Sequence, residues 1–302
     1  MKNKLPNFLV VGAAKSGTSS LHQYLIQHPE IFMATINKEG VSVKEPQFLI
    51  KSKVQERLHF GVWNWGEYKA LFEDVEQEKA IGESTVFYLY YYKEAIKNIK
   101  LRLGNEVKII ILLRNPVDRA FSAFQHVSKS VKESLSFEDA LNQENGRLEQ
   151  DLTLTPMVMY KDMGLYYDMV KAYKEEFDNV HVILYEDFRD KSDKVLKGVF
   201  EFLEVNIKTK INSSTRHNVG GKRWKNQKMK NLFQKDNILK NIYMKFVPDI
   251  IKDNVKEKLV KLSTNKVTSM NMKTKVYLQS FFKEDINKLS ALIERDLKHW
   301  TI

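Results

Sequence analysis

A short run near the start of the chain combines a lysine, two glycines and several hydroxyls in a spacing that suits an anion. It reads Gly12-Ala13-Ala14-Lys15-Ser16-Gly17-Thr18-Ser19-Ser20 and separates an apolar stretch from a segment with helical spacing. In such a loop the backbone N–H groups and the helix N-terminus converge on an anion, and Gly17 permits close approach. A plain turn with a Ser/Thr cap would give no reason for Lys15. We therefore expect a phosphoester to bind at Lys15, Ser16, Gly17, Thr18, Ser19 and Ser20.

The loop differs from the phosphate loop of kinases and ATPases. That loop ends in Gly-Lys-Ser/Thr, whereas here Thr18 follows Gly17 and Lys15 comes two residues before the glycine. An NTPase also needs an Asp at the end of a later apolar strand to help hold Mg²⁺, but the apolar run of residues 107–113 is followed by Arg114. The dinucleotide fingerprint Gly-x-Gly-x-x-Gly is absent as well. A nucleotide kinase is therefore kept only as an alternative.

A second candidate anion site follows that apolar run. It reads Arg114-Asn115-Pro116-Val117-Asp118-Arg119-Ala120-Phe121-Ser122-Ala123-Phe124. Arg114 at the end of a strand and Ser122 in the next helix could face the same crevice as the first loop, where open α/β sheets bind ligands. A ligand with phosphate at both its 5′ and 3′ positions would need such a pair. Arg119 is expected to form a structural salt bridge with Asp118.

The two motifs together resemble a known family. The sequence Lys-Ser-Gly-Thr-Ser-Ser-Leu, followed about a hundred residues later by Arg-Asn-Pro-Val-Asp-Arg-Ala-Phe-Ser, is similar to the paired 5′-phosphosulfate and 3′-phosphate motifs of the sulfotransferases that use 3′-phosphoadenosine 5′-phosphosulfate (PAPS). The bacterial and heparan-sulfate-type carbohydrate branch is the most similar. The resemblance implies a PAPS-dependent sulfotransferase with a P-loop-like α/β fold, PAPS as the only cofactor and no metal.

Further segments extend this resemblance over most of the chain. They are Lys44-Glu45-Pro46-Gln47-Phe48, Gly82-Glu83-Ser84-Thr85-Val86-Phe87-Tyr88, residues 180–188 and Glu294-Arg295-Asp296-Leu297-Lys298-His299-Trp300. Two positions depart from the pattern. Val86 replaces the usual Pro, and Ser84 stands where the heparan-sulfate enzymes often carry a Lys, so substrate contacts at these positions are not carried over.

The resemblance also implies roles for single residues. Lys15 would neutralise the bridging oxygen as it leaves, and Glu45 would take the proton of the acceptor, with His126 and Glu83 as rival bases. Tyr185 matches a Tyr that touches the nucleotide, although a strand aromatic could equally belong to the core. The late basic loop would place Gly221, Lys222 and Arg223 on the 3′-phosphate, or it is only a solvated basic loop.

Apolar runs and helical spacings define the elements that must position these residues. Strands are predicted at 8–12, 79–83, 107–113 and 180–185, and helices at 18–27, 91–103, 117–131 and 165–177. Alternating strands and helices predict a three-layer α/β core with a parallel sheet. Strand signals end near residue 205, and residues 226–302 look helical and Lys-rich. We therefore expect one sulfotransferase domain over 1–302, with the core in 1–205 and helices in 206–302.

The composition limits the function classes. The 302 residues include no Cys and seven scattered His, so disulfides and thiolate metal sites are excluded and no structural metal is expected. The net charge of +11 is concentrated late in the chain, where residues 208–302 hold 22 Lys/Arg and 8 Asp/Glu. This basic third could be a solvated surface or could bind an anionic cofactor, a polyanion or an anionic membrane. The first apolar run is too short for a signal sequence or a membrane span, which favours the cytoplasm.

The acceptor is the least determined partner. The branch resemblance points to a sugar or glycoconjugate, and aromatic side chains could form a platform for it. The candidates are Trp63, Trp65, Tyr68, Tyr88, Tyr90, Tyr91 and Tyr92. A polyanion-binding protein that uses the basic third is a further alternative, but no nucleic-acid module supports it. A catalytically dead sulfotransferase fold is disfavoured because Lys15, Glu45, Arg114 and Ser122 are all retained.

Overall fold

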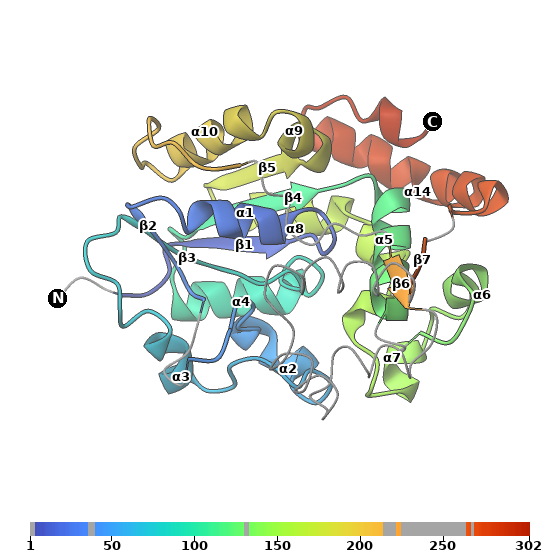
Figure 1. The fold of residues 1–302 in the computed structure, drawn as a ribbon, viewed down its shortest axis with the longest axis horizontal. Coiled ribbons are helices and arrows are strands. Elements are labelled where there is room, and N and C mark those ends of the chain that lie inside the picture. Colours follow the sequence, from blue (N-terminus) through green and yellow to red (C-terminus); the bar gives the residue numbers. More distant parts are fainter. Residues whose placement is uncertain (1–3, 36–39, 130–132, 214–221, 225–263, 267–268) are drawn as a thin grey trace, which may run out of the picture.

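A five-stranded parallel sheet forms the centre of the computed structural model (Figure 1). The strands are β1 (Phe8–Gly12), β2 (Ile31–Met33), β3 (Ala80–Ser84), β4 (Lys108–Leu113) and β5 (Val180–Leu184), in the order β2-β3-β1-β4-β5. The structure describes residues 4–35, 40–129, 133–213, 222–224, 264–266 and 269–302. Because β1 lies between β3 and β4, the loops that follow these three strands open at one edge of the sheet. The predicted parallel α/β core is confirmed.

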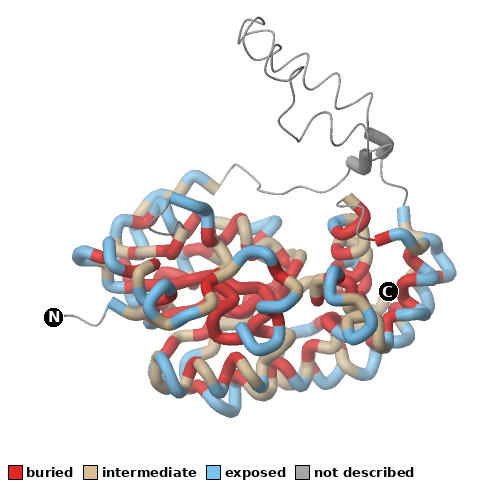
Figure 2. The backbone as a smooth tube through the Cα atoms, turned by 90° about the horizontal axis from the view of Figure 1, so that it is seen from below, coloured by how far each residue is buried: buried red, intermediate tan, exposed pale blue. Residues whose placement is uncertain are grey.

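The central strands are buried on both faces, as their continuous apolar runs predict. Phe8 and Val10 of β1 point into one core with side chains of α1 (Thr18–Leu25) and α10 (Ser192–Phe202). Leu9 and Val11 point into the opposite core, which contains side chains of four longer helices. These helices are α4 (Tyr92–Arg102), α5 (Pro116–Lys129), α8 (Tyr167–Glu176) and α14 (Met272–Leu292). Figure 2 shows the buried residues in the middle of the molecule, with exposed residues around them.

Short helices connect these layers. The α-helical ones are α2 (Lys51–Val54), α3 (Trp65–Ala70), α6 (Phe137–Asn142), α7 (Arg147–Gln150) and α9 (Tyr185–Asp190). Single 3₁₀ turns lie at Phe48–Ile50, Pro156–Val158, Asp162–Gly164 and Lys298–Trp300. The first of these turns begins at Phe48, the last residue of the Lys44–Phe48 motif, so that motif lies between β2 and α2.

The structure corrects the sequence prediction in three places. Ile31–Met33 forms the edge strand β2, although three residues are too few for a clear strand signal. Tyr185 begins α9 rather than ending β5. Lys222–Trp224 (β6) and Thr264–Lys266 (β7) pair as an antiparallel ribbon, so strands do occur after residue 205. The ribbon lies against α5 (Figure 1).

Candidate active site

The loop after β1 presents unpaired backbone donors at the start of α1. Lys15 and Gly17 have positive φ angles of 70° and 93°, which turn the chain sharply into the helix. Ser16 N donates to Ala13 O at 3.3 Å, and the Ser16 side chain is fully buried. The N–H groups of Lys15, Gly17, Thr18 and Ser19 have no acceptor within the described part of the chain. Such a row of donors at a helix N-terminus is an anion site.

Arg114 joins the second predicted motif to this loop. Its Nη1 donates to Lys15 O at 3.2 Å, and its guanidinium lies 4.8 Å from the centre of the Tyr185 ring. The same ring covers Gly17, where an added Cβ would lie 3.2 Å from Tyr185 Cδ2. Arg114 Nε is buried and has no hydrogen-bond partner among the residues that the structure describes. The structure therefore brings Lys15, Gly17, Arg114 and Tyr185 together and leaves a guanidinium donor for a ligand.

One face of α5 forms a further wall. Ser122, His126 and Lys129 follow the i, i+4, i+7 spacing that places side chains on one side of a helix. Desolvation by the surrounding protein and the charges of Lys15 and Lys129 lower the pKa of His126 to about 4, although its side chain is exposed. His126 is therefore neutral near pH 7. Sequence reasoning missed Lys129, although its helical spacing from Ser122 and His126 could have revealed it.

Positive charge dominates the space around Lys15. Burial, together with the charges of Lys129, Arg114 and Lys44, lowers the pKa of Lys15 to about 8, while Glu45 acts in the opposite direction. Four cations around one carboxylate favour an anionic ligand. The described residues contain no group of three or more His, Asp or Glu side chains arranged to hold a metal ion.

Glu45 is the carboxylate whose charge acts on Lys15. Its Oε1 accepts a hydrogen bond from Lys44 Nζ at 3.0 Å, and its Oε2 accepts one from Gln47 Nε2 at 3.3 Å. The side chain keeps 20% of its surface exposed. Gln47 is fully buried and adopts a left-handed backbone conformation with φ 61°. Glu45 is thus a partly accessible carboxylate that two hydrogen bonds fix in place and whose charge acts on Lys15.

Glu83 differs from Glu45 in its burial and in its hydrogen-bond partners. Its side chain is fully buried and accepts hydrogen bonds from three hydroxyls rather than pairing with a Lys. The donors are Tyr68 Oη at 3.1 Å, Thr85 Oγ1 at 2.7 Å and Tyr88 Oη at 2.8 Å. Burial, which these hydrogen bonds only partly offset, raises the pKa of Glu83 to about 7. A carboxylate in this position is enclosed by the protein.

Several other candidate residues take structural positions. Tyr68 and Tyr88 are fully buried, so they belong to the core rather than to a sugar platform. Ser84 is also fully buried, with its Oγ 3.0 Å from His22 Nδ1. Tyr90 is half-buried and donates to Asp162 at 2.6 Å. Trp63, Trp65, Tyr91 and Tyr92 remain partly exposed.

Arg119 does not form the expected salt bridge. Its side chain is fully buried and donates to the carbonyl oxygen of Tyr160, while Asp118 is exposed. Neighbouring residues of a helix point in different directions, so adjacency in sequence was a poor guide. The structure describes only part of the late basic loop. Gly221 lies outside the described residues, and Lys222 and Arg223 lie in β6 beside α5.

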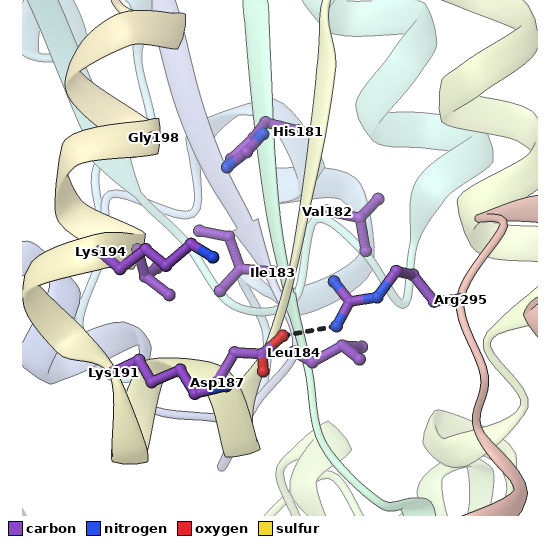
Figure 3. A pocket seen from close by; sticks show the side chains of 10 residues that line it. His181, Val182, Ile183, Leu184, Asp187, Lys191, Lys194, Gly198 and Arg295 are labelled. Atoms are coloured by element: carbon purple, nitrogen blue, oxygen red, sulfur yellow. Dashed lines mark hydrogen bonds and ion pairs between the residues drawn. The ribbon is translucent and has the colours of Figure 1, made fainter.

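A separate cavity of about 370 Å³ lies beside the edge strand β5 (Figure 3). Arg295 and Asp187 form an ion pair of 2.6 Å at its wall, and Lys191 and Lys194 are exposed lysines of its rim. None of the residues predicted to bind the donor lines this cavity. It is therefore distinct from the loop and Arg114 site.

The fold and the site define an α/β protein with two joined anion-binding motifs and a nearby carboxylate. The chain matches the sulfotransferase domain family over residues 5–289 and belongs to that family. It is 29% identical to a sulfotransferase from Alicyclobacillus acidocaldarius, whose crystal structure matches with a TM-score of 0.72 over 98% of this chain and 99% of that one.

Two curated relatives match shorter segments. The membrane-associated sulfotransferase kil1 of Dictyostelium discoideum is 33% identical over 152 residues, which are 48% of this chain and 29% of the relative. The human bifunctional heparan sulfate N-deacetylase/N-sulfotransferase 3 is 28% identical over 124 residues, which are 41% of this chain and 13% of the relative. The chain thus spans less than a third of these relatives. Within the described residues, no helix has both the length and the apolar character needed to cross a bilayer.

Proposed function

We propose that this protein transfers a sulfuryl group from PAPS to a hydroxyl or amine of an acceptor, without a metal ion. The observation that carries the proposal is the 3.2 Å hydrogen bond from Arg114 Nη1 to Lys15 O, which joins the two anion motifs at one edge of the sheet. A donor with separate charged groups at its 5′ and 3′ ends requires two such motifs in one site.

The residues present suit this donor. The free N–H groups of Lys15, Gly17, Thr18 and Ser19 would hold the 5′-phosphate, with the hydroxyls of Thr18, Ser19 and Ser20 as further donors. Arg114 has a buried Nε without a partner and would bind the 3′-phosphate with Ser122. Tyr185 would contact the nucleotide beside Arg114. Gly221, Lys222 and Arg223 stay predicted contacts of the 3′-phosphate, and Ser16 stays a predicted contact of the 5′-phosphate.

Two side chains would perform the chemistry. When bound, PAPS supplies a sulfuryl group whose bond to a phosphate oxygen breaks as the bond to the acceptor atom forms. Lys15 carries its positive charge below about pH 8 and would stabilise the negative charge that develops on that oxygen. Glu45 would accept the proton of the acceptor, because it is a partly exposed carboxylate whose charge acts on Lys15.

The acceptor is proposed to be a carbohydrate or glycoconjugate. The support is the likeness to proteins named as heparan sulfate N-deacetylase/N-sulfotransferases. The cations Lys44 and Lys129 beside the site are also suited to an acidic sugar. The partly exposed side chains of Trp63 and Trp65 are the aromatic faces that remain for stacking on a sugar ring.

The test is transfer of labelled sulfate from PAPS to de-N-sulfated heparan sulfate and to neutral oligosaccharides, in buffer that contains EDTA. We expect transfer by the unaltered protein and its loss in Lys15→Ala and Arg114→Ala. Donor binding that is unchanged by both substitutions would sink the proposal. ATP turnover that requires Mg²⁺ would instead favour a nucleotide kinase, and salt-sensitive polyanion binding that is insensitive to Lys15→Ala would favour a binding protein.

A further inference from the structure

The segment of residues 44–50 carries Glu45 and ends in the 3₁₀ turn Phe48–Ile50. Val62 N donates to Pro46 O at 2.8 Å and Asn98 Nδ2 donates to Leu49 O at 2.8 Å, and two further bonds join the segment to hydroxyls. Gln47 N donates to Thr85 Oγ1 at 3.4 Å, and Leu49 N donates to Tyr88 Oη at 3.3 Å. Both contacts are buried. Gln47 in turn donates from its side chain to Glu45. The position of the Glu45 carboxylate therefore depends in part on two hydroxyl oxygens that must act as acceptors for backbone N–H groups.

A hydroxyl has one proton, so its direction decides whether its oxygen can accept a given N–H. Thr85 and Tyr88 both direct their protons at Glu83, over 2.7 Å to Oε2 and 2.8 Å to Oε1. An ionised carboxylate only accepts, so it fixes both protons away from the backbone. The lone pairs of Thr85 and Tyr88 are then free for Gln47 N and Leu49 N.

We propose that Glu83 is a positioning residue for the base: it orients the hydroxyls of Thr85 and Tyr88, and these hold the Gln47 and Leu49 backbone that places Glu45. The proposal rests on the proposed role of Glu45. Glu83 touches neither donor nor acceptor and acts only through this chain of bonds. The pKa of about 7 leaves Glu83 ionised at pH 8.

The left-handed backbone of Gln47 explains why such a device is needed. A residue other than Gly is strained in this conformation and keeps it only where surrounding contacts impose it. The bond to Thr85 and the bond from Ile50 N to Gln47 O, 3.1 Å, are such contacts. Without the first, the segment can relax and Glu45 can shift away from Lys15.

The chain offers a matched pair of variants. Tyr68 and Tyr88 are both fully buried and both donate to Glu83 Oε1. Of these two, only Tyr88 also accepts a hydrogen bond from Leu49 N, in the segment of residues 44–50 that carries Glu45. Tyr68→Phe therefore removes a bond to Glu83 alone, and Tyr88→Phe removes the link to Leu49 as well. Glu83→Gln keeps the shape but brings an NH₂ group that forces at least one hydroxyl to reverse.

The experiment is hydrogen exchange by mass spectrometry at pH 8 on the full chain without ligands, with the β4 peptide as reference. We expect the peptide of residues 44–50 to exchange about tenfold faster in Glu83→Gln and Tyr88→Phe, and at the normal rate in Tyr68→Phe. Equal rates in Tyr68→Phe and Tyr88→Phe, or an unchanged peptide in Glu83→Gln, would overturn the proposal. If Glu83→Gln fails to fold, the two tyrosine variants test the Tyr88–Leu49 link, and the pH dependence of the unaltered protein tests Glu83. The peptide of residues 44–50 should lose protection relative to the β4 peptide as the pH falls from 8 to 6 and Glu83 gains a proton, and equal relative protection at both pH values would overturn the proposal.

Transfer from PAPS to de-N-sulfated heparan sulfate supplies the functional readout. We expect kcat to fall about 10- to 100-fold in Glu83→Gln and Tyr88→Phe while KM for PAPS changes less than about threefold. Full activity of Glu45→Gln would refute the base role proposed above, whatever Glu83 does. Loss of transfer in Glu45→Gln with normal exchange and normal kcat in Glu83→Gln would refute only the positioning role.

Discussion

The donor half and the base half of the site are held in place by different means. The donor half consists of Arg114 and the loop between β1 and α1. The groups that would bind the donor are backbone N–H groups and cationic side chains, and they are fixed at the ends of strands. The base half is an irregular segment, and its bonds reach from Gln47 and Leu49 to residues 38 and 39 positions away in sequence. Donor binding and proton removal should therefore fail independently.

Glu45→Gln should give the largest difference between the two halves, because it should lower kcat and leave donor binding unchanged. The amide keeps the shape but cannot take a proton, so kcat should fall by about 10²- to 10⁴-fold while the affinity for adenosine 3′,5′-bisphosphate (PAP) stays unchanged. Steady-state transfer and calorimetry measure the two quantities. Full activity here combined with a comparable loss in His126→Asn would assign the base role to His126 instead.

Gly17→Ala should damage the donor half alone. The new Cβ would lie 3.2 Å from Tyr185 Cδ2 at a φ of +93°, so the ring that also contacts Arg114 must shift. We expect PAP to bind about tenfold more weakly. Gly104→Ala is the matched control, since Gly104 has φ +95° and nothing within 4 Å of the added atom. Both variants should lose similar stability, and an equal effect on PAP affinity would contradict the role of Gly17.

The charge of Lys15 should make donor binding depend on pH. Its pKa of about 8 in the free protein means that the side chain is charged at pH 7 and loses its proton as the pH rises through 8. Because the phosphates of PAP take up their second charge near pH 6, the range above pH 7 reports on Lys15. PAP affinity should change little between pH 7 and about 7.5 and then fall by no more than about tenfold per pH unit. Lys15→Met should remove this dependence, and a persisting dependence would assign it to another group.

The contrast between the halves also explains what the sequence could predict. The loop around Lys15 and the strand-end Arg114 were predicted because their chemistry lies within a few consecutive residues beside strong strand signals. The short strands β2 and β6 give almost no pattern, and Tyr185 was assigned to the wrong element. The bonds from Gln47 N to Thr85 and from Leu49 N to Tyr88 join residues that are 38 and 39 positions apart, so no local spacing could indicate them.

The most direct test of the account compares PAP with adenosine 5′-monophosphate by calorimetry in metal-free buffer. The two nucleotides differ only in the 3′-phosphate, which we assign to Arg114 and Ser122. We expect PAP to bind about 10- to 100-fold more tightly than the monophosphate, and Arg114→Ala to abolish most of this preference. Equal affinity for both nucleotides, or a preference that survives in Arg114→Ala, would contradict the two-anion donor site.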